Sequence, residues 1–158
     1  MENRHRQFFL TVFLSVFIDQ FSKYLVAGFL SESGSLSIFR YFSLTLIRNK
    51  GICFGFLNNL NVKNIIIAAS VIIAVGIFLY LEEYVKDKQI IIALGLIEGG
   101  IIGNLIDRIR IGAVIDFINF HIWPVFNFAD TLIVVGVSII FFHYFKRGRY
   151  VSGVPADR

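Results

Sequence analysis

Four apolar stretches, each close to 20 residues long, limit what this chain can fold into. An α-helix rises about 1.5 Å per residue, so about 20 apolar residues cross the roughly 30 Å hydrocarbon core of a bilayer. The composition agrees, since 56% of the 158 residues are hydrophobic, 16% are charged and the mean hydropathy is +0.74. We therefore predict four transmembrane helices, over the approximate spans 7–30, 63–81, 89–106 and 125–145.

The segment between the first two predicted helices is rich in β-branched and aromatic residues. Residues 36–56 read LSIFRYFSLTLIRNKGICFGF, and polar and apolar residues alternate over residues 43–46. Such alternation predicts short strands, and aromatic side chains suit the membrane–water interface. The sequence has no linker, repeat or low-complexity tract. The expected fold is a mostly α membrane protein in a single domain, residues 1–158, with a small interfacial β-sheet in the outer loop between helices 1 and 2.

Clustered basic residues at both ends orient the predicted bundle. The chain carries RHR at residues 4–6 and KRGR at residues 146–149, and cytoplasmic segments are enriched in Lys and Arg near membrane helices. Both termini are therefore expected in the cytoplasm, with the loops 31–62 and 107–124 on the outer side. The other basic residues are scattered and do not form an aromatic-lined groove, so no nucleic-acid partner is predicted.

Ionisable residues inside the apolar spans each need a partner. Asp19 and Lys23 lie one helical turn apart, so the carboxylate and the ammonium can neutralise each other. The pair can be a structural ion pair or part of an active site, and both interpretations stay open. Glu98 lies in mid-span, where it is either protonated in the bundle interior or paired with Lys23.

The third predicted helix carries small residues at a regular spacing. Gly95, Gly99 and Gly103 recur every four residues, which places them on one face and predicts a structural role in close helix packing. The adjacent face presents Asn104 and then Arg108 toward the outer end. These two side chains can be packing and interface residues or part of a catalytic site.

Three aspartates gather at the outer end of the predicted bundle. Asp116 is flanked by Val, Ile and Phe, and Asp130 lies in the first turns of the fourth helix, while Asp107 precedes both. Desolvation holds a carboxyl proton more tightly, whereas a helix N-terminus favours the carboxylate. Two such acids close together would share one proton, so that one deprotonates a water and the other polarises a carbonyl group. This arrangement predicts hydrolysis without a metal or a covalent intermediate.

Other chemistries fit these residues less well. The sequence has no H-E-x-x-H motif and His121 is the only histidine near the acids, so neither a metal site nor a cofactor is predicted. The single Cys53 excludes an internal disulfide and is interpreted as a small buried hydrophobe. A small four-helix transporter with Asp19 or Glu98 as proton carrier is the alternative function, and a scaffold subunit is a third. Neither explains the gathering of aspartates at one end.

Five ordered motifs, spread over essentially the whole chain, resemble those of the lipoprotein signal peptidases, also called signal peptidase II. They are DQFSK at 19–23, NKGICFG at 49–55, GGIIGNLIDR at 99–108, VIDF at 114–117 and FNFAD at 126–130. Two places depart from the family pattern, namely the Ile52-Cys53 pair and Glu98. These departures concern local packing more than the acidic pair.

The resemblance implies a role for each motif residue. The aspartate within VIDF and the aspartate that closes FNFAD correspond to the family's catalytic pair, so Asp116 and Asp130 would be catalytic. Asp107 would pair with Arg108 and not cut. The residues that would form the polar active-site shell and bind substrate are Asp19, Lys23, Asn49, Gly51, Asn104, Arg108 and Asn127.

The same resemblance implies a substrate and a location. An aspartic endopeptidase of this family would remove the signal peptide from a bacterial prolipoprotein, just before a cysteine that already carries diacylglycerol. It would act as a monomer among the lipids of the cytoplasmic (inner) membrane, with its active site near the outer leaflet and no cofactor. Each buried methylene of the acyl chains contributes about 0.8 kcal/mol to membrane binding, so the substrate would enter sideways between helices.

Overall fold

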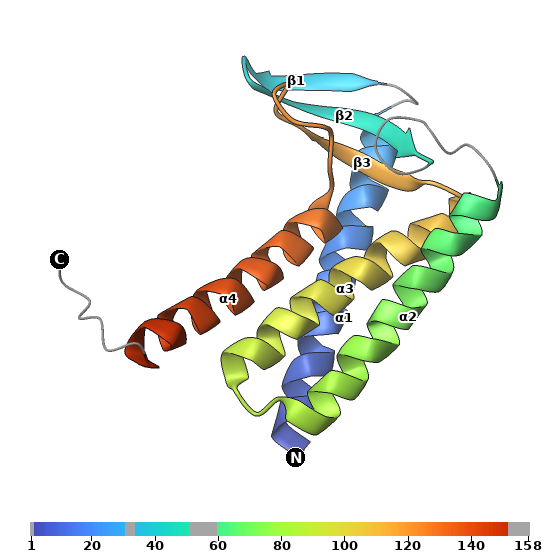
Figure 1. The fold of residues 1–158 in the computed structure, drawn as a ribbon. Coiled ribbons are helices and arrows are strands. Elements are labelled where there is room, and N and C mark those ends of the chain that lie inside the picture. Colours follow the sequence, from blue (N-terminus) through green and yellow to red (C-terminus); the bar gives the residue numbers. More distant parts are fainter. Residues whose placement is uncertain (1, 31–33, 51–59, 152–158) are drawn as a thin grey trace.

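The computed structural model describes residues 2–30, 34–50 and 60–151. Helices account for most of these residues, and a small sheet lies at one end of the helical bundle (Figure 1). The elements in chain order are α1 (Glu2–Phe29), β1 (Ser35–Phe39), β2 (Phe42–Asn49), α2 (Leu60–Tyr84), α3 (Lys88–Ile111), β3 (Val114–Asn119) and α4 (Phe128–Val151).

All four helices are long and apolar enough to cross a membrane, which confirms the predicted fold class. Helix α3 runs further than the predicted end at residue 106, because it stops only at Gly112, whose φ of 74° lies in the left-handed region that ends helices. Asp107 and Arg108 are therefore helical, and the prediction that they open a loop was wrong. Helix α4 begins three residues after the predicted position, because Asn127 caps it.

Helix α3 is the centre of the bundle. More than half of the membrane-spanning part of α3 is buried inside the protein, whereas only 6% of the corresponding part of α2 is buried. Figure 1 shows α3 between α2 and α4, with α1 crossing behind it. The helix that carries the longest motif therefore contacts all three of the others.

Glycines let the neighbouring helices approach α3 closely, as the small-residue spacing predicted. A Cβ atom on Gly95 would lie 2.8 Å from Thr11 Cβ of α1, and one on Gly99 would collide with Ser15 Cβ. On the adjacent face, a Cβ on Gly100 would lie 2.5 Å from the backbone oxygen of Ala129. Real Cβ atoms essentially never approach so closely, so these positions hold α1 and α4 against α3.

The sheet has three antiparallel strands in the order β1-β2-β3. The prediction of strands between the first two helices is confirmed for residues 35–49, while the part of that prediction over residues 51–56 lies outside the described residues. The third strand comes from the connection between α3 and α4 and was not predicted. Its register places Asp116 opposite Ile47 of β2. The sheet thereby joins both predicted outer loops beside the ends of the helices.

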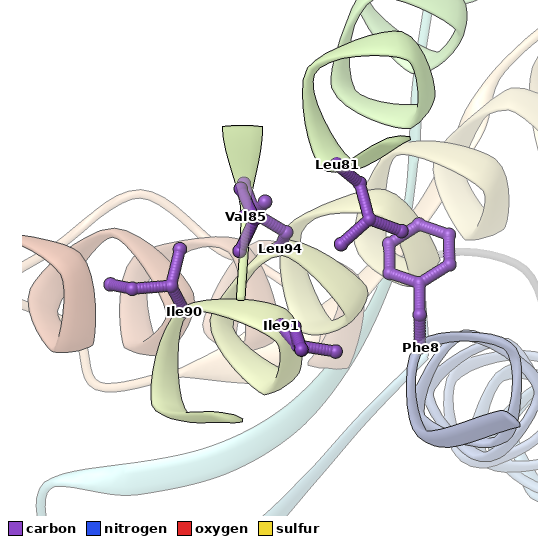
Figure 2. Close-up of a cluster of buried hydrophobic side chains, with 6 residues drawn as sticks. All are labelled: Phe8, Leu81, Val85, Ile90, Ile91 and Leu94. Carbon is purple, nitrogen blue, oxygen red and sulfur yellow. The ribbon is translucent and has the colours of Figure 1, made fainter. Parts of the chain in front are cut away.

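Two apolar clusters lie at opposite ends of the bundle. The cluster away from the sheet joins α1, α2 and α3 and consists of Phe8, Leu81, Val85, Ile90, Ile91 and Leu94 (Figure 2). At the other end, Val26 of α1 packs with Leu46 and Phe117 under the sheet. Large apolar side chains also cover the outer helix surfaces, such as Ile72, which is 71% exposed. Such outer surfaces suit contact with lipid.

Candidate active site

The two aspartates proposed as a pair come from different elements at the sheet end of the bundle. Asp116 lies on β3 and is 3% exposed, whereas Asp130 lies in the first turn of α4. One residue, Asn127, contacts both. Its Nδ2 donates to Asp116 Oδ1 at 2.7 Å, and its backbone N–H donates to Asp130 Oδ2 at 3.3 Å. The fold thus brings these two aspartates, which are 14 residues apart in the sequence, into one site.

The start of α4 explains why Asn127 and Asp130 face each other. Asn127 Oδ1 accepts a hydrogen bond from the backbone N–H of Asp130 at 3.0 Å, while the Asp130 carboxylate accepts from the backbone N–H of Asn127. This reciprocal pair is a capping box, which satisfies N–H groups that the first helical turn leaves without partners. The cap of the helix therefore also orients the Asp130 carboxylate.

Asn104 of α3 links the same carboxylate to the interior of the bundle. Its Nδ2 donates to Asp130 Oδ1 at 2.9 Å, and its Oδ1 accepts from Asn127 Nδ2 at 3.0 Å and from Lys23 Nζ at 3.1 Å. A lysine can only donate, so it determines that the Asn104 oxygen faces Lys23 and that the amide N–H group faces Asp130.

Lys23 is the centre of a buried ionic cluster next to this network. Its Nζ lies 2.8 Å from Asp19 Oδ2 and 2.8 Å from Asp107 Oδ2, and the three side chains are nearly inaccessible. The predicted pairing of Asp19 with Lys23 is confirmed. Asp107 was expected to pair with Arg108, with which it interacts electrostatically, but its ion pair is with Lys23 on the face of α3 that contacts α1. Lys23 is fully engaged there and does not pair with Glu98.

Asp19 ties α1 to the beginning of α4. Its Oδ1 accepts a hydrogen bond at 2.9 Å from the backbone N–H of Ala129, which belongs to the first turn of α4. Gly103 makes the approach possible, since a Cβ there would lie 2.5 Å from Asp19 Oδ2. The position of Asp130, next in sequence to Ala129, thus depends on a contact between three helices.

The remaining predicted shell residues lie around the pair. Asn49, at the end of β2, donates from Nδ2 to Asp116 Oδ2 at 3.0 Å. Arg108 donates to the backbone oxygen of Asn104 at 3.3 Å and interacts electrostatically with Asp130 and Asp116. Gly51 lies outside the described residues. The described shell therefore surrounds the two carboxylates with N–H donors and positive charge.

Burial sets the protonation of Asp116. Desolvation by the surrounding protein raises the pKa of this carboxyl from its usual 3.8 to about 6. The hydrogen bond from Asn49 lowers the pKa, the negative charge of Asp130 raises it, and the hydrogen bond from Asn127 lowers it. Desolvation outweighs the hydrogen bonds, so Asp116 holds a proton more tightly than an exposed aspartate does.

Gln20, for which no role was predicted, also contributes to the buried ionic cluster. Its Nε2 lies within 3.1 Å of three oxygens, those of Asp19, Asp107 and the Gly103 backbone, and thus joins α1 to α3. A polar side chain inside an apolar span, next to a buried aspartate, was the signal that could have found it. Among residues 2–30, 34–50 and 60–151, no group of three His, Cys, Asp or Glu side chains could hold a metal ion.

Comparisons with known proteins identify the family. Residues 11–146 match the family model described as signal peptidase (SPase) II. A lipoprotein signal peptidase of Caldanaerobacter subterraneus subsp. tengcongensis is 41% identical over 136 residues, which cover 84% of this chain and 92% of that protein. One from Syntrophus aciditrophicus is 40% identical over 142 residues, which cover 84% and 88%.

The fold agrees with a solved structure. A bacterial membrane enzyme determined at 2.3 Å resolution superposes with a TM-score of 0.81 at 25% identity, covering 96% of this chain and 93% of that one. The matches to sequence and fold both extend over the spanning helices and the sheet. The chain therefore belongs to the signal peptidase II family and is a multi-pass peptidase of a bacterial membrane.

Proposed function

We propose that this peptidase removes the signal peptide from diacylglyceryl-modified prolipoproteins, just before the lipid-modified cysteine, with Asp116 and Asp130 as its catalytic pair. The relatives named lipoprotein signal peptidase support the substrate class. The observation that carries the catalytic assignment is the bridge through Asn127, which contacts both carboxylates at the sheet end of the membrane bundle.

The different surroundings of the two aspartates suggest their roles. Asp116 has a raised pKa and would hold the shared proton, which it would donate to the oxygen of the scissile carbonyl. Asp130 accepts two N–H groups at a helix N-terminus, an environment that favours the negative charge. It would remove a proton from the attacking water and later deliver that proton to the leaving nitrogen.

The amide shell would keep both carboxylates in this geometry during the reaction. Asn127 and Asn49 donate to the two different oxygens of Asp116, and Asn104 holds Asp130 from the opposite side. Preorganised donors of this kind need little rearrangement as charge moves in the transition state. Arg108 would stabilise the negative charge of the two aspartates. Lys23 is linked to Asp130 through Asn104.

The location of the site suits a substrate that never leaves the bilayer. We place both termini in the cytoplasm, so the sheet and the aspartates lie at the outer leaflet. Exposed aromatic residues on and beside the sheet, including Tyr41 and Trp123, belong at such an interface. A lipid-anchored peptide would reach the pair sideways from the membrane, and the sheet would exclude water from the bound segment.

Neutralising either aspartate tests the assignment. Asp116→Asn and Asp130→Asn should each lower cleavage of a diacylglyceryl-modified prolipoprotein by at least about 10²- to 10⁴-fold, the usual contribution of a general acid or base. Both variants should still accumulate in the membrane. The matched control is Glu83→Gln, which neutralises an exposed acid at the end of α2 and should remain active. Full activity in either aspartate variant would overturn the proposal.

A further inference from the structure

A groove between the start of α3 and the end of α4 lies far from the aspartates. It has a volume of about 490 Å³ and opens on the outer surface of the bundle. Its walls are mainly apolar, and its polar side chains are Gln89 in the first turn of α3 and Ser138, His143 and Lys146 along α4. The lining residues are Gln89, Ile92, Val135, Ser138, Ile139, Phe142, His143 and Lys146.

The polar and apolar parts of the groove are separated along the helix axis. Along α4, the ionisable residues His143 and Lys146 lie nearer the helix end than Val135 and Ile139. Ser138 lies between the two apolar residues, but its hydroxyl is already used, since it donates to the backbone oxygen of Val134 at 2.8 Å. The two helices run antiparallel, since His143 Nδ1, late in α4, lies 3.2 Å from Gln89 Oε1 at the start of α3, whereas Asp130 at the start of α4 contacts Asn104 late in α3. The groove is thus apolar toward the middle of the membrane and polar at the end of the bundle away from the sheet.

The length of the groove matches one leaflet of a bilayer. Residues 135 to 146 of α4 are eleven steps apart, which corresponds to about 16 Å at 1.5 Å per residue. One leaflet contributes about half of a roughly 30 Å hydrocarbon core. A single acyl chain that ends at the membrane midplane would therefore fit along this groove, with its headgroup at the polar end.

The polar end of the groove is basic. Lys146 makes no hydrogen bond or ion pair with the other described residues, and Lys88 and Arg147 are exposed beside it. One acid, Asp87, lies at the start of α3, where its Oδ1 accepts the backbone N–H of Gln89 at 2.8 Å. Its Oδ2 lies 3.7 Å from His143 Nε2. The three cations Lys88, Lys146 and Arg147 outnumber this carboxylate, so a negative headgroup at this place would meet a net positive charge.

We propose that this groove binds one acyl chain of an anionic phospholipid, with the headgroup phosphate on Lys146. If His143 Nδ1 donates to Gln89 Oε1, the amide NH₂ of Gln89 is left to donate to a phosphate oxygen. Basic pockets between membrane helices recognise anionic headgroups in this way. The occupant is a lipid and not a peptide substrate, because the groove lies along α4 at the end opposite to the aspartates.

The test is lipid binding to the purified full chain, measured by native mass spectrometry. The probes are dioleoyl phosphatidylglycerol, dioleoyl phosphatidylcholine and sodium phosphate. The wild-type protein should bind phosphatidylglycerol more tightly than phosphatidylcholine, and phosphate should not compete. Lys146→Gln should weaken phosphatidylglycerol binding about fivefold, which corresponds to the roughly 1 kcal/mol that one lysine contributes near anionic lipid. Its binding of phosphatidylcholine should not change.

Matched substitutions separate this groove from general effects. Arg147→Gln removes a neighbouring charge that does not line the groove, and should change phosphatidylglycerol binding less than Lys146→Gln does. Val135→Trp fills the apolar part and should remove the bound lipid, whereas Val134→Trp changes an exposed valine outside the groove and should not. Retained peptidase activity in each variant shows that the protein is folded.

Several outcomes would overturn the proposal. Equal affinity of the wild-type protein for the two lipids would mean that the groove binds membrane lipids without selecting the headgroup. Competition by phosphate at millimolar concentration would indicate an anion site without an acyl chain. Equal effects of Lys146→Gln and Arg147→Gln would mean that only the overall charge matters.

Discussion

Removing the Asn49 amide should shift the pH dependence of the enzyme in a direction that the geometry determines. Asn49 Nδ2 donates to Asp116 Oδ2 at 3.0 Å and thereby lowers the pKa of that carboxyl. A hydrogen bond to a charged group contributes about 1.5–3 kcal/mol, and we take the lower end because Asn49 is exposed and water can replace part of it. Since 1.36 kcal/mol corresponds to about one pKa unit, Asn49→Ala should raise the pKa of Asp116 by up to about one unit.

The sign of the activity change follows from the proposed role of Asp116. If the reaction needs a proton on this carboxyl, activity falls as the pH rises through its pKa, which is about 6 in the free enzyme. A higher pKa keeps the proton to higher pH, so the alkaline limb of the profile should move upward in Asn49→Ala. The dependence of kcat/KM on pH, measured with a lipid-modified prolipoprotein peptide in micelles, reports the ionisation of the free enzyme.

A matched variant controls for the loss of an amide from the sheet. Asn119, on β3, donates to Thr45 Oγ1 at 3.2 Å and makes no contact with the aspartates. Asn119→Ala should therefore leave the pH profile in place. An unchanged alkaline limb in Asn49→Ala, or a shift toward lower pH, would refute the assignment of the shared proton to Asp116.

Two further substitutions test the buried cluster that supports the pair. Lys23→Met leaves the buried carboxylates of Asp19 and Asp107 without their cation and should lower the free energy of unfolding by about 3–5 kcal/mol, with partial rescue by Asp107→Asn. Chemical denaturation in micelles measures this, and unchanged stability of the single variant would contradict the ion-pair assignment. Gly103→Ala should displace Asp19 and cost about 1–3 kcal/mol together with most of the activity, whereas Gly28→Ala, which meets no atom within 4 Å, should do neither. Thermal unfolding and cleavage assays on the two alanine variants distinguish these outcomes.

The membrane helices could be predicted because their signal is local. A run of about 20 apolar residues needs no knowledge of the rest of the chain to be recognised as a span, and the part of the chain that the structure describes holds four such helices. Their ends were less accurate. Helix α3 continues to Ile111 because a left-handed glycine follows it, and α4 starts at Phe128 because Asn127 caps it. Both effects depend on single residues, whose contribution is lost when hydropathy is averaged over about 20 residues.

The third strand was missed for a different physical reason. Residues 114–119, VIDFIN, form too short a run to be told from a loop or from the end of a helix. They become a strand by pairing with β2, which lies more than 60 residues earlier in the chain. That pairing brings Asn49 to Asp116, a contact that no local pattern contains.

The partners of the buried charges likewise needed the folded chain. Spacing predicted the pair of Asp19 with Lys23, because both lie on one helix, four residues apart. It did not predict that Lys23 also holds Asp107, or that Gln20 bridges α1 and α3, since these contacts depend on how two helices are rotated about their axes. The glycine spacing indicated which face of α3 is approached, but not which residues approach it.

The sequence by itself determined that this protein lies in a membrane and which segments span the bilayer. It also determined the family to which its motifs point and the candidate acids. These are properties of composition and order, which survive without any tertiary contact. Only the tertiary structure decided which oxygen of each carboxylate receives which N–H group, that Asn127 joins Asp116 to Asp130, and that Asp107 belongs to Lys23. Hydrogen bonds act over about 3 Å and depend on direction, so their partners are determined only when the helices and the sheet have packed.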